Sequence, residues 1–119
     1  MATAKTTIGL TAAAREICED LQERLRFKEL GDMRDFAIAH AIRTEIEPKK
    51  VQNTQTIWSS TNVNPEIVAT LEVFYPDEAA EDVYLLYQNL ANLGLLALGQ
   101  DKNYRQWKEI SHLPGIVEK

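Results

Sequence analysis

Polar and apolar residues alternate at the start of the chain. Thr6, Ile8 and Leu10 fall on one face of an extended segment, and the residues between them fall on the other. This alternation predicts a short strand over residues 6–10. Thr11 follows at the position of a helix N-cap, where its hydroxyl can accept a hydrogen bond from an unpaired backbone N–H.

Two helices with different apolar patterns are predicted next. Segment 12–26 carries its apolar residues on one face, which is typical of an amphipathic helix. Gly31 is expected to close a turn and Asp32 to cap a second helix over residues 32–45. The centre of this second helix is apolar nearly all round, which indicates burial on more than one side. Pro48 is expected to stop it.

The second half of the chain begins with a polar stretch, residues 48–63, that is rich in Asn, Thr and Ser. We interpret it as a linker or an ordered loop, held in place by Ile57 and Trp58. Further helices are predicted over residues 65–75, 78–99 and 102–112, with Gly99 as a C-cap. The predicted fold class is mostly α, with a strand-helix-helix unit over residues 1–47 and a helical C-terminal region over residues 64–119.

Composition places the chain among ordinary globular domains. It has 119 residues, of which 45% are hydrophobic and 26% charged, so it can bury a modest core. Its one cysteine, Cys18, excludes an internal disulfide, and its helical position favours a packed side chain over a reactive thiol. No apolar run approaches the roughly 20 residues of a membrane span. We therefore expect a soluble, cytoplasmic protein without membrane contact.

Charge is distributed unevenly along the chain. Residues 1–50 carry nine basic and nine acidic side chains, whereas residues 51–119 carry four and nine, which accounts for the net charge of −5. Nonspecific nucleic-acid binding depends on basic surface. The overall balance argues against such binding but leaves room for a local basic strip in the first half.

The order strand, amphipathic helix, Gly turn and apolar helix over residues 4–46 resembles the ribbon-helix-helix DNA-binding superfamily. In that family the strand pairs with the same strand of a second subunit. A lone strand needs such a partner for its backbone groups, and the apolar second helix needs a cover. The resemblance therefore implies a homodimer, and the residues expected at its interface are Ile8, Leu10, Phe36 and His40.

The resemblance also implies a DNA-binding surface. The outer face of the strand would enter the major groove with Lys5, Thr7 and Gly9, and Arg34 would contact a phosphate at the start of the second helix. Gly9 offers no side chain to a base, and the carboxylate of Asp32 would repel a phosphate. The leading hypothesis is a homodimeric DNA-binding regulator or antitoxin-like protein. The alternative is a degenerate ribbon-helix-helix dimer that acts as a protein-protein adaptor without binding DNA.

Signals for other chemistry are weak. His40, His112 and Cys18 do not have the spacing of a zinc site, and the acidic run at residues 77–82 suits a helix start. No paired acid and base or activated nucleophile can be assembled from the sequence. We therefore predict no enzyme, no metal and no cofactor, and we expect the C-terminal helices to bind any protein partner.

Overall fold

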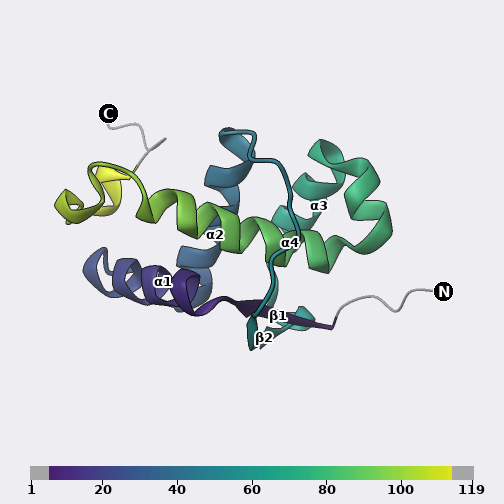
Figure 1. Cartoon of the computed structure of the whole chain (residues 1–119), viewed down its shortest axis with the longest axis horizontal. Helices are drawn as coiled ribbons and strands as arrows, with labels where there is room; N and C mark the ends of the chain where they lie inside the picture. Colours follow the sequence, from purple (N-terminus) through teal and green to yellow (C-terminus); the bar gives the residue numbers. More distant parts are fainter. Residues whose placement is uncertain (1–5, 114–119) are drawn as a thin grey trace.

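The computed structural model describes residues 6–113 of the chain. Four α-helices and a two-stranded antiparallel sheet form in this part of the chain (Figure 1). The elements are β1 (Thr7–Leu10), α1 (Ala12–Arg24), α2 (Leu30–Arg43), β2 (Gln55–Ser59), α3 (Pro65–Phe74) and α4 (Pro76–Gly99). Short 3-10 turns follow at η1 (Ser60–Asn62), η2 (Tyr104–Gln106) and η3 (Ile110–His112). The predicted mostly α fold with an N-terminal strand-helix-helix order is confirmed.

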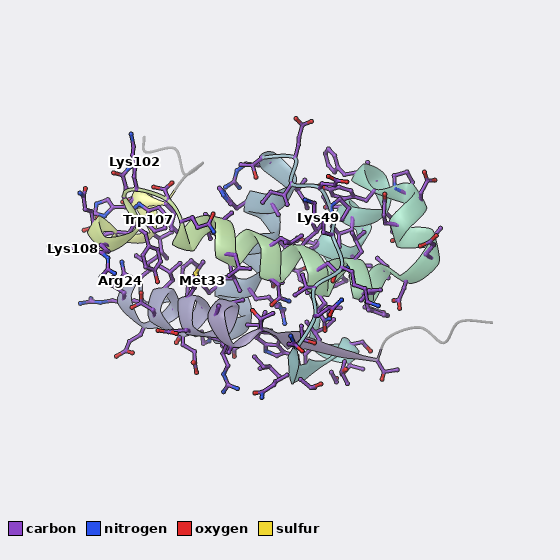
Figure 2. All side chains as sticks on the ribbon, viewed as in Figure 1. Arg24, Met33, Lys49, Lys102, Trp107 and Lys108 are labelled. Carbon is purple, nitrogen blue, oxygen red and sulfur yellow. The ribbon has the colours of Figure 1, made fainter. Side chains whose placement is uncertain are left out.

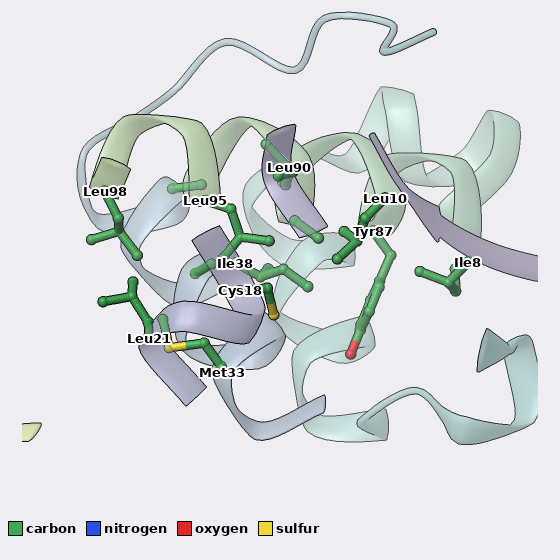
Figure 3. Close-up of a cluster of buried hydrophobic side chains, with 14 of the residues drawn as sticks. Ile8, Leu10, Cys18, Leu21, Met33, Ile38, Tyr87, Leu90, Leu95 and Leu98 are labelled. Atoms are coloured by element: carbon green, nitrogen blue, oxygen red, sulfur yellow. The ribbon is translucent and has the colours of Figure 1, made fainter. Parts of the chain in front are cut away.

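Helix α4 forms the centre of the molecule. Every residue from Leu86 to Asn92 is buried, and the helix packs against α1, α2, α3 and β1. Figure 3 shows Leu90 and Leu95 of α4 in one apolar cluster with Leu21 of α1 and Ile38 of α2. This cluster extends in sequence from Ile8 to Leu113, so the N-terminal unit and the C-terminal region share one core.

Two glycines allow the close approach of the helices around α4. A Cβ atom at Gly94 would overlap the backbone carbonyl of Ala37 in α2, and one at Gly99 would overlap the side chain of Ile17 in α1. The prediction that Gly99 caps α4 is wrong, because the cap is Gln100. Gly99 instead lies at the contact between α1 and α4, where it has no side chain to overlap Ile17.

The boundary between α1 and α2 also differs from the prediction. Thr11 caps α1 as expected, since its hydroxyl accepts a hydrogen bond from the Ala14 N–H at 3.1 Å. The turn that follows α1 contains Arg26, whose φ is 61°, and Gly31 lies inside α2. Asp32 is not the N-cap, because Glu29 and Asp32 form a reciprocal capping box that starts α2 earlier.

The polar stretch before α3 contains the second strand. β2 pairs antiparallel with β1, with Trp58 opposite Ile8 and Ser59 opposite Thr7. Ile57 and Trp58 pack against the core, as predicted. Asn64 caps α3 through a hydrogen bond from the Glu66 N–H at 2.9 Å.

The predicted helix over residues 102–112 is wrong, because only the 3-10 turns η2 and η3 form there. Nη1 of Arg24 in α1 donates hydrogen bonds to the carbonyl oxygens of Tyr104, at 2.6 Å, and Trp107, at 3.2 Å. Trp107 is buried, and its ring lies edge-on to that of Tyr104. The segment is therefore held by contacts with α1 in place of its own helical hydrogen bonds.

Candidate functional site

Both edges of β1 are occupied within the chain. One edge pairs with β2. On the other side, the Gly9 N–H donates to Oε1 of Gln88 at 2.8 Å, and Nδ2 of Asn92 donates to the Gly9 carbonyl at 3.1 Å. The Thr11 N–H donates to Oδ1 of Asn92 at 2.8 Å. Gln88 and Asn92 lie one helical turn apart on α4, so their amides act together as a substitute for a neighbouring strand.

In the structure β1 therefore has its partners within its own chain, in place of the expected counterpart in a second subunit. Ile8 and Leu10, expected at a dimer interface, are 0% and 1% exposed in the core of their own chain. Figure 3 shows both in the same buried cluster as Tyr87 of α4. Sequence reasoning missed this intrachain partner because the stretch interpreted as a linker or loop supplies β2. A homodimer stays a prediction, without the reason first given for it.

Of the three residues expected to read bases, Thr7 and Gly9 are described, and neither residue is fully exposed. Gly9 is buried, and a Cβ atom there would lie 2.7 Å from the carbonyl oxygen of Gln55 in β2. Thr7 is half-buried. Lys5 lies outside the described residues.

Arg34 is the predicted phosphate contact, but it is only 2% exposed. Its guanidinium bonds to the Asp35 carboxylate at 2.8 Å and to the Asn62 carbonyl at 3.3 Å. The rings of Trp58 and Tyr87 lie 4.5 and 5.2 Å from it, at cation–π distance. This side chain is enclosed by β2, η1 and α4, and its expected contact with a phosphate stays a prediction.

Carboxylates outnumber the guanidinium of Arg34 in the hollow beside it. Three carboxylates line it, from Glu29, Asp32 and Asp35. Tyr87 donates a hydrogen bond to Asp35 at 2.5 Å, and burial, followed by this bond, raises the pKa of the Tyr87 hydroxyl. The cluster joins α2 to α4 and to the chain around η1, which is a structural role.

Phe36 and His40, the other residues expected at the interface, are half-buried on α2. The Phe36 ring lies 6.3 Å from that of Phe27, and the Arg43 guanidinium lies over it. Nδ1 of His40 is buried without a hydrogen-bond partner in the described part of the chain. Burial, followed by the nearby Arg43 cation, lowers the pKa of His40.

A different surface carries exposed apolar side chains. Val73 and Phe74, at the end of α3, are 74% and 62% exposed. Next to Phe74 is a hollow of about 320 Å³. Its apolar lining comes from Ile42, Ile46, Pro48, Phe74 and Tyr75, and its acidic lining from Glu45 and Glu47.

Pro48 also lines a second hollow, of about 530 Å³, beside the first half of α4. Leu85, Leu86 and Asn89 line it together with Pro48, and the charged residues around it are Lys50, Glu78, Glu81 and Asp82. We refer to Val73, Phe74 and the two hollows as the acidic-apolar surface. Sequence reasoning missed it, although one signal was present: residues 51–101 contain no Lys or Arg.

Basic residues gather at the opposite end of the molecule. Figure 2 shows Arg24, Lys102 and Lys108 where α1 ends, whereas α3 lies at the far end of the long axis in Figure 1. Arg105 shares a groove with Arg24, and Arg26 shares one with Lys108. Acidic residues line the same grooves, Glu16 and Asp20 in the first and Glu109 in the second, so this end carries charges of both signs.

Other chemistry has little support in the described residues. Burial raises the pKa of the Cys18 thiol to about 12, which suppresses the reactive thiolate. Residues 6–113 hold no group of three His, Cys, Asp or Glu side chains placed to bind a metal ion.

None of the helices within residues 6–113 has the length and apolar character needed to cross a membrane. Comparison of the chain with protein-family models, curated proteins and solved structures gives no significant match. The resemblance to the ribbon-helix-helix superfamily thus rests on the order of the elements alone.

Proposed function

We propose that this chain is a small protein-binding module of the adaptor class and that it does not bind DNA through β1. The observation that carries the proposal is the exposure of Val73 and Phe74, with Phe74 lining a hollow of apolar and acidic residues that shares Pro48 with a second such hollow. Contiguous exposed apolar patches on soluble proteins mark interaction sites.

The energetics of such a surface favour association with a protein. Full burial of one Phe side chain contributes about 1.5–3 kcal/mol. Phe74 retains most of its area for that purpose, and Val73 next to it adds to the same patch. Acidic side chains around the patch would select among partners and steer their approach.

The occupied edges of β1 and the burial of Arg34 support this proposal over the DNA-binding hypothesis. A regulator of the ribbon-helix-helix type needs an open strand face and a cation at the phosphate position. Here the strand backbone bonds to Gln88 and Asn92, and the guanidinium bonds to Asp35. The proposal requires no homodimer, and the cytoplasmic location stays a prediction.

Two measurements test the proposal together. The first is an anisotropy titration of the full chain with random-sequence duplex DNA at low salt, where electrostatic binding is strongest. The second places a photo-crosslinking amino acid at position 74, in cells that make this protein, with position 23 as the control. Glu23 is exposed on α1, away from the acidic-apolar surface.

We expect no duplex binding at tens of micromolar protein and a covalent protein adduct at position 74 that is absent at position 23. Duplex binding at micromolar concentration would contradict the proposal. Equal adducts at both positions, or none at either, would also contradict it, because the exposed patch would then have no specific partner.

A further inference from the structure

The hollow beside the first half of α4 lies at an interruption of that helix. Asp82 has non-helical backbone angles, φ −165° and ψ 96°, within α4. Its carboxylate accepts a hydrogen bond from the Leu85 N–H at 3.1 Å, so it caps the second half of the helix. Leu85 and Leu86 lie at the start of that second half, and Pro48 and Lys50 line the same hollow.

The lining of this hollow combines apolar and acidic groups. Pro48, Leu85 and Leu86 supply the apolar part. Three carboxylates surround it, from Glu78, Glu81 and Asp82, against one ammonium group, from Lys50. Glu78 and Glu81 are exposed, so their charges remain available to a ligand.

We infer that this hollow binds a basic amphipathic segment of a partner protein, with the apolar side chains of the segment on Leu85 and Leu86 and its Lys or Arg side chains on Glu78 and Glu81. The inference rests on the proposed function and names the chemistry of the partner. In apolar grooves that bind amphipathic helices, the apolar face of the helix lies in the groove and its charged side chains lie at the rim.

Charge complementarity decides between this occupant and others. Including Lys50, the hollow has a formal charge of −2, and Glu45 and Glu47 line the hollow on the other side of Pro48. An acidic peptide, or a nucleic-acid backbone, would meet repulsion there. A second copy of the chain would have to present basic side chains, such as Lys108 or Arg105, to the same place.

The probe is a fluorescent amphipathic helical peptide with leucines on one face and lysines on the other. A peptide with glutamates in place of the lysines is the control. Binding to the full chain is followed by anisotropy, and amide chemical shifts of Leu85 and Leu86 locate the site. The variants are Glu81→Gln and Leu85→Ala, and Glu23→Gln is matched to the first, since it removes the same charge at the opposite end.

We expect the lysine peptide to bind and to shift the Leu85 and Leu86 amides, and the glutamate peptide to bind at least tenfold more weakly. Glu81→Gln should weaken binding about two- to fivefold, as for one exposed ion pair. Leu85→Ala should weaken it about tenfold, and Glu23→Gln should leave it unchanged. Rising salt should weaken binding to wild type more than to Glu81→Gln.

Equal binding of the two peptides, or shifts located elsewhere, would overturn the inference. Salt-sensitive self-association of the chain without peptide binding would also overturn it, because a second copy would then be the occupant. If a photo-crosslinker at position 74 captures a protein but the lysine peptide does not bind, the proposed protein-binding function is supported. Only the assignment of a basic segment to this hollow is then overturned.

Discussion

Replacing Asn92 by Leu tests the arrangement of β1 most directly. Asn92 is 0% exposed, and Leu has the same branched skeleton with somewhat bulkier end groups, so the change removes polar groups without opening a cavity. The Thr11 N–H and the Gly9 carbonyl would each lose the hydrogen bond that they make with this amide. No other side chain in the described part of the chain bonds to both.

The magnitude follows from the two groups that lose a partner. A buried donor or acceptor left without a hydrogen bond costs about 1–3 kcal/mol. Thr11 is half-buried, so water can recover part of its loss. We therefore expect Asn92→Leu to lower the free energy of unfolding by about 2–4 kcal/mol, a large part of the roughly 5–15 kcal/mol of a typical domain.

Urea unfolding followed by far-ultraviolet circular dichroism measures this difference as a shift of the transition midpoint. Asn62→Leu is the control, because the Asn62 side chain is exposed and only its backbone carbonyl bonds to Arg34. The control should stay within about 0.5 kcal/mol of wild type.

A loss below about 1 kcal/mol for Asn92→Leu would refute this reasoning. That result is expected if β1 pairs with a second subunit, because the partner strand would then satisfy the backbone of Gly9 and Thr11. The measurement therefore separates a closed single chain from a ribbon dimer, independently of any function.

Other predictions concern packing and pH. Gly94→Ala should lower the free energy of unfolding by at least about 1–3 kcal/mol, since the new methyl overlaps the Ala37 carbonyl. The control Gly31→Ala should not lower it, because the atom nearest to the new methyl belongs to the Arg34 side chain, at 3.4 Å. Both are read from urea midpoints. The pKa of His40 is lowered from about 6.5 in the folded state, so the unfolded state binds its proton first as pH falls. Wild type should lose stability as pH falls below about 6.5, and His40→Gln should remove that part of the loss in pH-dependent melting.

Local signals in the sequence predicted the helices and several of their ends. Thr11 and Asn64 cap α1 and α3 because their side-chain oxygens follow an extended backbone and meet unpaired N–H groups. Pro65 suits the first turn of α3. Interactions within a few residues decide features of this kind, so they can be read without the rest of the fold.

Features that depend on distant residues were missed. The capping box at Glu29 involves a weaker N-cap residue than Asp32, and the position of α2 is decided by its packing on α4. The turns near Tyr104 replace a predicted helix because Arg24, far away in sequence, binds their carbonyl groups. Periodicity cannot show such a competitor for hydrogen bonds.

The expected DNA-binding residues depend on distant contacts in the same way. The interpretation of Lys5, Thr7 and Gly9 as a DNA-facing strand assumed that the strand has no partner in its own chain. The backbone groups of the four-residue β1 can bond to any backbone or side-chain amide that reaches them. Gln88 and Asn92 bond to β1 because α4 packs beside that strand. In the sequence alone, they look like ordinary polar residues of a helix.

Arg34 shows how one residue can have two roles that its sequence position does not distinguish. At the start of a helix an arginine suits a phosphate, but the rings of Trp58 and Tyr87 and the carboxylate of Asp35 offer it a buried site instead. Burial of an arginine costs free energy unless partners of this kind surround it. With these partners in place, the guanidinium of Arg34 is buried in the core. Val73 and Phe74 remain exposed outside this core, which is why the proposed binding surface is placed there.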